Sequence, residues 1–386
     1  MRPFFIQSFL SLFFLMLIGC TPIDATNELG TEELREILLR CKKNDITVKD
    51  IHQDGNCYLM ILSDGTVINL GRNIFLIGID IRGYWDLNGK MTDVPLSSSA
   101  ETILLKQTPT NCLCSLVEGY TDWSFYLEDD VILLGKTLFS IDPDTVLRGI
   151  NHRGYCPEAP ENTLPAYRLS RLKGFKYVEA DIRFTSDGVP VLIHDETVNR
   201  TSDGSGSVKE LTWDEIRGLD FGSWKSSVFA ETRIPSLEEF FILCKSIGLC
   251  PYIELKEGKR DQIGAIVDLV DKYGLKDNVV YISFSSALLG FVSFFNPGAT
   301  LGLLVNNHLS ETAVLTAKAL STNTNTIFIN ASDFSESAVS ICNTASIPLQ
   351  IWTVDDKQTI LSLPSYISGV TSNIYHAGRL LLEAGR

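Results

Sequence analysis

The sequence predicts an α/β protein whose larger part is a TIM-type (β/α)8 barrel, preceded by a small, mostly β domain. From Val146 to the C-terminus, about 240 residues alternate between short runs rich in Val and Ile and stretches of helical periodicity. The first of these runs is not followed by a Gly-x-Gly-x-x-Gly turn, which disfavours an open, doubly wound sheet. Between residues 46 and 144, short β-like runs are broken by turns, as in a small β domain.

Nine segments of the C-terminal part, residues 146–386, have the composition of strands. They are residues 147–152, 176–182, 189–194, 250–255, 279–284, 300–305, 326–330, 348–353 and 368–372. Because the barrel holds eight strands, one segment is in excess. The excess falls near residues 177–195, where the short link Thr185-Ser186-Asp187-Gly188 leaves no room for a helix. The two runs form either a hairpin about Asp187 or a parallel pair without a helix, and in both cases the barrel is irregular there.

Helices are expected between most of these strands. One begins near Thr163 with Pro165 in its first turn. Another begins at Ser236, where Glu239 completes a capping box. Five more are expected near residues 260–274, 285–295, 311–320, 333–345 and 356–363.

The N-terminal region lacks the alternation of strand-like and helical segments that is seen after Val146. Residues 21–45 are expected to form a polar tether and then a short amphipathic helix. The apolar face of that helix consists of Leu34, Ile37, Leu38 and Cys41. Within residues 46–144, the run CYLMILSDGTVINL predicts a hairpin about Asp64-Gly65. The phrases SDGTVINL and GYWDLNGK resemble β-rich N-terminal modules of surface lipoproteins from gut Bacteroidetes.

Residues 1–20 resemble a bacterial lipoprotein signal peptide. Arg2 precedes an apolar run that ends in Leu17-Ile18-Gly19-Cys20. The resemblance implies removal of the segment before Cys20 and lipidation of Cys20, which would hold the protein on a membrane outside the cytoplasm, at the periplasmic face or the cell surface. The alternative is a transmembrane anchor, but the apolar run is short of the ~20 residues that a span needs.

The net negative charge of the chain argues against nucleic acid as a binding partner. The chain has 33 Lys and Arg against 47 Asp and Glu, a formal net charge of -14, and it contains no basic run. Nucleic acid is excluded as a partner on this ground, because binding to its phosphates relies on clustered Lys and Arg. An anionic small-molecule substrate would need a local cation.

Carboxylates recur at strand spacing in the C-terminal part. Glu179 and Asp181 lie two residues apart on one predicted strand, so both side chains point to one face, and Glu254 and Lys256 repeat this geometry on another. In a barrel, such groups at the C-terminal ends of strands converge at one mouth. Three carboxylates without Cys or a His-Glu-x-x-His motif favour a hard cation, so the sequence predicts one Mg²⁺, Ca²⁺ or Mn²⁺ ion.

Two of the five histidines, His152 and His194, lie at predicted strand ends beside charged residues. Because histidine titrates near neutrality, one imidazole can take a proton while the other gives one. Arg153 offers a fork of donors for a phosphate, and Gly154 allows the backbone to approach closely. These residues predict a metal-assisted hydrolase of an anionic ester.

Eight motifs follow one another in a characteristic order. They are HRG at 152–154, APENT at 159–163, Glu-x-Asp at 179–181, DGVPVLIHD at 187–195, TSDGSG at 201–206, LDFGSW at 219–224, IPSLEE at 234–239 and ELK at 254–256. In order and spacing they resemble the glycerophosphodiester phosphodiesterase family. The resemblance covers Val146 to the C-terminus and implies a barrel enzyme that uses one divalent cation to hydrolyse glycerophosphodiesters to sn-glycerol 3-phosphate and an alcohol.

The resemblance also implies a role for each matching residue. The metal ligands would be Glu179, Asp181 and Glu254; the acid/base pair would be His152 and His194; and the phosphate contacts would be Arg153 and Lys256. Trp352 matches an aromatic residue beside the glycerol site, although a core tryptophan of the barrel is an equally good interpretation.

One departure from the family concerns the last strand. The family pattern Gly-Ile-Ile-Thr-Asp-Tyr-Pro is replaced here by Gly369-Val370-Thr371-Ser372-Asn373, which is expected to alter the substrate end of the pocket rather than the chemistry. Two other functions are therefore kept open: hydrolysis of a lysophospholipid or a glycerol-phosphate polymer, and a non-catalytic barrel that binds phosphoglycerol.

Overall fold

A computed structural model describes residues 29–54, 57–72, 74–79, 84–87, 90–95, 113–118, 122–127, 130–135, 142–306, 309–320 and 325–385. The chain forms two compact units, a mainly N-terminal one and one that contains the barrel. The lipoprotein signal and Cys20 lie outside the described residues, and the predicted domain boundaries stay predictions. In the part of the chain that is described, no helix is both long and apolar enough to cross a membrane.

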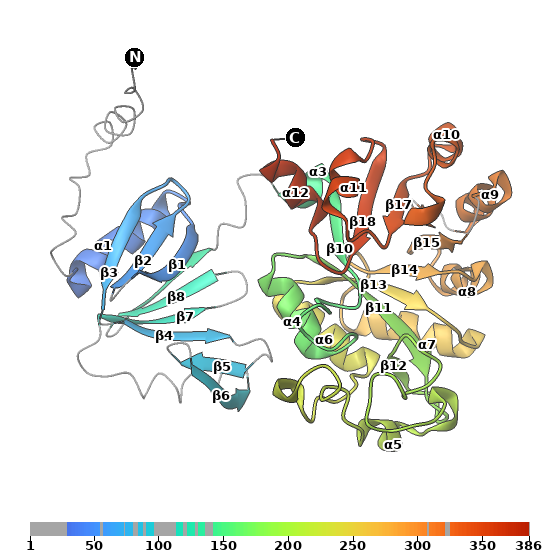
Figure 1. The fold of residues 1–386 in the computed structure, drawn as a ribbon, viewed down its shortest axis with the longest axis horizontal. Helices are drawn as coiled ribbons and strands as arrows, with labels where there is room; N and C mark the ends of the chain where they lie inside the picture. Colours follow the sequence, from blue (N-terminus) through green and yellow to red (C-terminus); the bar gives the residue numbers. More distant parts are fainter. Residues whose placement is uncertain are drawn as a thin grey trace, which may run out of the picture. The chain divides into compact units, whose positions relative to one another are not determined.

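The C-terminal unit is a closed barrel of eight parallel strands, which confirms the predicted TIM-type fold (Figure 1). Pairing of the first strand with both the second and the last closes the ring. The strands are β10 (Arg148–Asn151), β11 (Tyr177–Phe184), β13 (Cys250–Leu255), β14 (Val280–Ser283), β15 (Thr300–Val305), β16 (Thr326–Asn330), β17 (Leu349–Trp352) and β18 (Ile367–Ser372).

The predicted excess strand is β12 (Pro190–Leu192), which pairs antiparallel with β11 and lies outside the ring. In this hairpin Ile182 is opposite Leu192, and the N–H of Ile193 donates to the carbonyl of Asp181 at 2.9 Å. Of the two alternatives, the hairpin is therefore confirmed. It brings the residues after β12 back to the strand that carries Asp181.

The seven helices expected between strands are all present and surround the barrel in Figure 1. They are α4 (Leu164–Leu172), α6 (Leu237–Ile247), α7 (Arg260–Lys272), α8 (Ser286–Phe295), α9 (Glu311–Ala319), α10 (Glu336–Ala345) and α11 (Lys357–Ser362). The capping box at the start of α6 is formed: Glu239 N–H donates to Ser236 Oγ at 3.2 Å, and Ser236 N–H donates to Glu239 Oε2 at 2.9 Å.

Several short helices were not expected from the sequence. They are α3 (Pro143–Val146), α5 (Trp213–Arg217), α12 (Ala377–Glu383) and the 3-10 turns η1 (Val208–Glu210), η2 (Ser227–Phe229) and η3 (Ala331–Asp333). Each of these helices has fewer than two full turns, so the hydrophobic periodicity of the sequence gives almost no indication of it. α12 packs against α3, and Gly378 permits this because a Cβ there would lie 1.9 Å from the Pro143 carbonyl oxygen.

Large side chains fill the interior of the barrel. A buried cluster of five residues from different strands occupies it: Ile150, Tyr252, Ile282, Leu304 and Phe328. All six residues of β13 are buried, as expected for a parallel strand that is covered on both faces. Because the interior is filled, chemistry is confined to the mouth, where the strands end.

The N-terminal part of the chain is mostly β, as predicted, in the residues that the structure describes. It contains α1 (Thr31–Lys43), an antiparallel sheet of β1 (Val48–Asp54), β2 (Cys57–Leu62) and β3 (Val67–Gly71), and a second sheet of β4 (Ile74–Ile79), β5 (Tyr84–Leu87), β6 (Lys90–Pro95), β7 (Cys114–Glu118), β8 (Asp122–Leu127) and β9 (Asp130–Gly135). The predicted hairpin about Asp64-Gly65 joins β2 to β3. The four residues predicted for the apolar face of α1 are all buried: Leu34, Ile37, Leu38 and Cys41.

Candidate active site

The sequence-predicted site residues of the barrel follow or end its strands. His152 comes directly after β10, Glu179 and Asp181 lie on β11, and Glu254 lies on β13. Arg153 follows His152, Lys256 lies just beyond β13, His194 lies two residues beyond β12, and Trp352 ends β17. Since parallel strands end at the same side of a barrel, the residues on and after its own strands belong to one mouth. His194 joins them because the antiparallel β12 returns beside β11, where the Ile193 N–H donates to the Asp181 carbonyl.

Three carboxylates form the centre of the site. One oxygen from each of Glu179, Asp181 and Glu254 lies within 4.8 Å of the other two. All three side chains are buried, and Glu179 Oε1 has no hydrogen-bond partner among the described residues. Lys256 Nζ lies 2.9 Å from Asp181 Oδ1 and 2.7 Å from Glu254 Oε1, so one ammonium group is shared by two of the acids.

The charges at this centre are not balanced. Burial, followed by the charges of Asp181 and Glu254, raises the pKa of Glu179 well above its usual value. Burial and the charge of Asp181 raise the pKa of Glu254 to about 7. Burial alone would also raise the pKa of Asp181, but Lys256 and Arg153 hold it far below the usual range. The protein alone therefore does not supply enough positive charge to ionise all three acids, and a divalent cation would supply it.

Arg153 is held at the edge of this centre by the turn after β10. Its backbone N–H donates to Glu179 Oε2 at 3.0 Å, Nη1 donates to Glu161 Oε1 at 3.0 Å, and Nε lies 3.3 Å from Asp181 Oδ2. The turn needs left-handed conformations, with φ of 57° at Arg153 and 78° at Gly154. A Cβ at Gly154 would lie 2.6 Å from the Cβ of Ala166, so only glycine fits.

Asn162 supports the centre, a role that the sequence analysis missed. Its Nδ2 donates to Asp181 Oδ2 at 2.8 Å, and its Oδ1 accepts from the Asp181 N–H at 3.2 Å and from the Tyr167 hydroxyl at 2.9 Å. These bonds orient both the carboxylate and the backbone of Asp181. In the sequence, this residue is the Asn of the motif APENT. In the structure it has a positive φ of 55° just before α4, a conformation that Asn tolerates better than most residues.

His194 has its own supporting acid. Its Nδ1 lies 2.8 Å from Asp195 Oδ1, and Arg200 donates both to Asp195 and, at 2.7 and 2.8 Å, to Glu161. Hydrogen bonds from Arg200 and His194 lower the pKa of Asp195 to about 2. Burial lowers the pKa of His194, although the charge of Asp181 opposes this shift. Neither Arg200 nor Glu161 was expected, because nothing local to either residue indicates that they meet.

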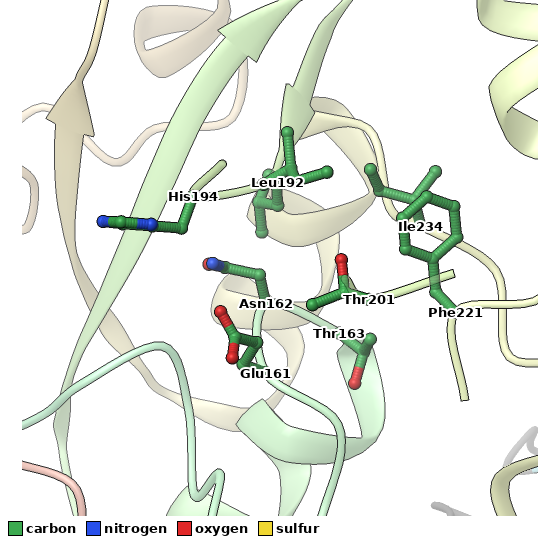
Figure 2. Close-up of a pocket in the computed structure, with 9 residues that line it drawn as sticks. Glu161, Asn162, Thr163, Leu192, His194, Thr201, Phe221 and Ile234 are labelled. Carbon is green, nitrogen blue, oxygen red and sulfur yellow. The ribbon is translucent and has the colours of Figure 1, made fainter. Parts of the chain in front are cut away.

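A small cavity lies beside His194. It has room for about one water molecule, with a volume near 10 Å³. Figure 2 shows the polar ends of Glu161 and Asn162 on the side of the view where His194 lies, Leu192 above Asn162, and Phe221 and Ile234 on the far side. Ile193, Phe221 and Ile234 belong to one buried apolar cluster, which supports the loop that carries His194.

His152 is contacted through its Nδ1 by Asn373, which follows β18. The distance from Nδ1 to Asn373 Oδ1 is 2.9 Å, and His152 Nε2 lies 3.9 Å from Glu179 Oε2. Burial and the charge of Arg153 lower the pKa of His152 to about 4. The departure from the family pattern at Asn373 was expected to affect the substrate end of the pocket; the structure instead places this residue in direct contact with a predicted catalytic group.

Trp352 was interpreted either as an aromatic residue beside the glycerol site or as a core residue of the barrel, and its position agrees in part with each. It is half-buried and packs against the barrel-core cluster defined above. Its ring also contacts the exposed Phe284 edge-on, with ring centroids 5.6 Å apart. Its position at the end of β17 therefore places it partly in the core and partly at the mouth.

A closed parallel barrel with a carboxylate centre and two histidines at its carboxyl mouth places the protein among the TIM-barrel proteins that carry their functional site at this end. Within that class, the chain belongs to the glycerophosphoryl diester phosphodiesterase family, whose model matches residues 152–374. The family resemblance drawn from the motifs is thereby confirmed.

Individual relatives agree with the family assignment. The chain is 32% identical over 212 residues to a glycerophosphodiester phosphodiesterase of Caldanaerobacter subterraneus subsp. tengcongensis, covering 54% of this chain and 86% of that protein. It is 41% identical over 132 residues to glycerophosphodiester phosphodiesterase 1 of Mus musculus, covering 34% and 40%. Among solved structures, a phosphodiesterase of Oleispira antarctica in complex with the product sn-glycerol-3-phosphate is 26% identical, with a TM-score of 0.57 and coverage of 64% and 99%.

Proposed function

We propose that this protein hydrolyses glycerophosphodiesters to sn-glycerol 3-phosphate and an alcohol, with a divalent cation and two histidines. The observation that carries the proposal is the carboxylate centre: His152 Nε2 lies 3.9 Å from Glu179 Oε2, and the residue before His194 is hydrogen-bonded to the backbone of Asp181. The product named for the Oleispira antarctica relative supports the choice of substrate class.

The chain's own residues divide the work. His152 and His194 are each bound through Nδ1, which leaves each Nε2 for the reaction. One Nε2 takes a proton from the water whose oxygen bonds to phosphorus, and the other gives a proton to the alcohol oxygen as its bond to phosphorus breaks. Lys256 and Arg153 stabilise negative charge on the phosphoryl oxygens.

The cation fits the residues that would hold it. Three buried carboxylates are a hard, all-oxygen donor set, which suits Mg²⁺, Ca²⁺ or Mn²⁺, and one oxygen of Glu179 lacks a partner among the described residues. Glu179, Asp181 and Glu254 would be its protein ligands. When bound, the ion acts as a Lewis acid that polarises a phosphoryl oxygen.

A substrate panel tests the proposal. The full chain in detergent should release glycerol 3-phosphate from glycerophosphocholine and glycerophosphoethanolamine, measured with a coupled dehydrogenase assay. Lysophosphatidylcholine and a glycerol-phosphate polymer are tested in parallel; turnover of lysophosphatidylcholine is followed by the choline released, because its other product, lysophosphatidic acid, is not a substrate of the dehydrogenase. Faster turnover of either of these two would move the assignment to that substrate, and binding of glycerophosphocholine without any turnover would leave a non-catalytic barrel.

We further propose that the protein is an exported lipoprotein attached to a membrane through Cys20, because residues 1–20 have the pattern of a lipoprotein signal. Cys20→Ser is expected to abolish acylation and move the protein from the membrane to the soluble fraction, since it removes the only thiol at the predicted cleavage site. Fractionation of cells that express each version measures this. Unchanged membrane association of the serine variant would indicate an uncleaved anchor instead.

A further inference from the structure

His152 stands at the end of a hydrogen-bonded chain that starts at a carboxylate on the protein surface. Asp355, in the loop after β17, is exposed, and it accepts three hydrogen bonds from the end of β18. Its Oδ1 accepts from Ser372 Oγ and from the Asn373 N–H, both at 2.8 Å. Its Oδ2 accepts from Asn373 Nδ2 at 2.6 Å. The other end of the Asn373 amide, Oδ1, lies 2.9 Å from His152 Nδ1.

The donors and acceptors in this chain fix the orientation of the Asn373 amide. A carboxylate only accepts, so the amide must turn its NH₂ group toward Asp355 and its oxygen toward His152. A second donor confirms that direction: Cys156 Sγ lies 3.1 Å from the same oxygen. Burial and the charge of Glu161 raise the pKa of Cys156 to about 11, so its sulfur keeps the hydrogen that it donates.

The orientation of the amide decides the tautomer of the imidazole. Since Asn373 Oδ1 can only accept, the hydrogen of a neutral His152 must be on Nδ1. Nε2 then carries a lone pair and faces the carboxylate centre, 3.9 Å from Glu179 Oε2. The loop that carries Asp355 is tied to the barrel next to it, because the Val354 N–H donates to the Thr371 carbonyl at 3.0 Å.

We propose that Asp355 and Asn373 are positioning residues that hold His152 with its hydrogen on Nδ1 and its Nε2 toward the substrate, an inference that rests on the proposed function for its effect on catalysis. Exchanging the two residues with each other, so that Asn stands at 355 and Asp at 373, should preserve the hydrogen-bonded chain. With Asn at 355 and Asp at 373, the carboxylate of residue 373 accepts from both His152 Nδ1 and the new amide, and the oxygen of that amide accepts from Ser372. Each single exchange breaks the chain.

The single variants fail for different reasons. In Asp355→Asn the amide oxygen takes the two donors of Oδ1, Ser372 Oγ and the Asn373 N–H, so its NH₂ group faces the Asn373 NH₂ group. Asn373 then flips, presents a donor to His152 and forces the hydrogen to Nε2. In Asn373→Asp two carboxylates face each other at hydrogen-bond distance and repel. We expect each single variant to lower kcat about 10- to 100-fold with little change in KM. The double variant D355N/N373D should exceed either single variant at least about tenfold in kcat.

A second readout does not depend on activity. Nitrogen NMR of the full chain labelled with 15N-histidine gives few signals, since the chain has five histidines, and His152→Ala identifies the relevant one. The hydrogen should be on Nδ1 in the wild type and in the double variant, and on Nε2 in Asp355→Asn. Asp356→Asn is the matched control, because Asp356 caps α11 one residue further on and should change neither kcat nor the spectrum.

Two results would overturn the inference: a wild-type His152 with its hydrogen on Nε2, or losses of kcat that multiply in the double variant. Thermal unfolding of each variant checks that it is folded; because Asp355 is exposed, its replacement does not remove core packing. If the wild type releases no glycerol 3-phosphate, the proposed function fails, while the NMR measurement still decides whether the hydrogen-bonded chain controls His152.

Discussion

Replacement of either His152 or His194 by alanine is expected to lower kcat for glycerophosphocholine about 10²- to 10⁴-fold, the range typical for loss of a general acid or base. Each imidazole is bound through Nδ1, at 2.9 Å to Asn373 and at 2.8 Å to Asp195, so each presents Nε2 to the reaction. KM should change little, because the proposed phosphate contacts, Lys256 and Arg153, stay in place. Steady-state release of glycerol 3-phosphate measures both constants.

The double variant and a control sharpen this test. If the two histidines act in one proton-transfer sequence, as proposed, His152→Ala/His194→Ala should be about as slow as the slower single variant. His52→Ala is the matched control: His52 is exposed, its Nδ1 lies 2.7 Å from Asp50 Oδ2, and it belongs to the N-terminal unit. Wild-type turnover in a folded His152 or His194 variant would remove that residue from the acid/base pair.

Removal of the divalent cation is expected to abolish hydrolysis, and Mg²⁺, Ca²⁺ or Mn²⁺ should restore it. Glu179, Asp181 and Glu254 crowd their oxygens within 4.8 Å, and without the cation they are compensated only in part by Lys256 and Arg153. The cation should also stabilise the fold, by about 2.7 kcal/mol at a concentration of 100 Kd. Activity after chelation and the Tm with and without cation are the two measurements.

The affinity for the cation should fall as the pH falls below about 7. Burial and Asp181 raise the pKa of Glu254 to about 7, so the cation-free protein holds a proton there that the unfolded chain releases near pH 4.3. A raised carboxyl pKa makes the cation-free fold lose stability as the pH rises through this window. Cation binding displaces the proton, so the gain in Tm should be larger at pH 8 than at pH 6.

Glu254→Gln isolates the ligand from general charge effects. This variant should weaken cation affinity by more than about tenfold, the loss that even an outer-shell change can produce. Glu336→Gln makes the same chemical change at an exposed position in the first turn of α10 and should leave the affinity unchanged. Hydrolysis that persists after exhaustive chelation, or equal cation affinity in the two variants, would refute the metal centre.

The order of the barrel's strands and helices was predictable, because each of these elements has a local sequence pattern. Val- and Ile-rich runs marked all eight barrel strands, and the capping box marked α6 at Ser236. The same patterns showed one strand too many near Asp187, but they could not tell a hairpin from a parallel pair. That choice depends on which part of the edges of β11 is free to pair, and only the closed barrel decides this. β10 and β13 occupy the two edges of β11 at its start, so β12 pairs with it near its end.

The candidate site divides in the same way. By itself the sequence determined which chemical groups are present and on which strand ends they lie, because a spacing of two residues on a strand fixes the face and parallel strands share one mouth. Only the tertiary structure decided what supports those groups. Asn373 reaches His152 across 221 positions, and Arg200 reaches Glu161 across 39. Such contacts leave no periodicity in the chain, since they depend on how loops from different strands fold over the mouth of the barrel.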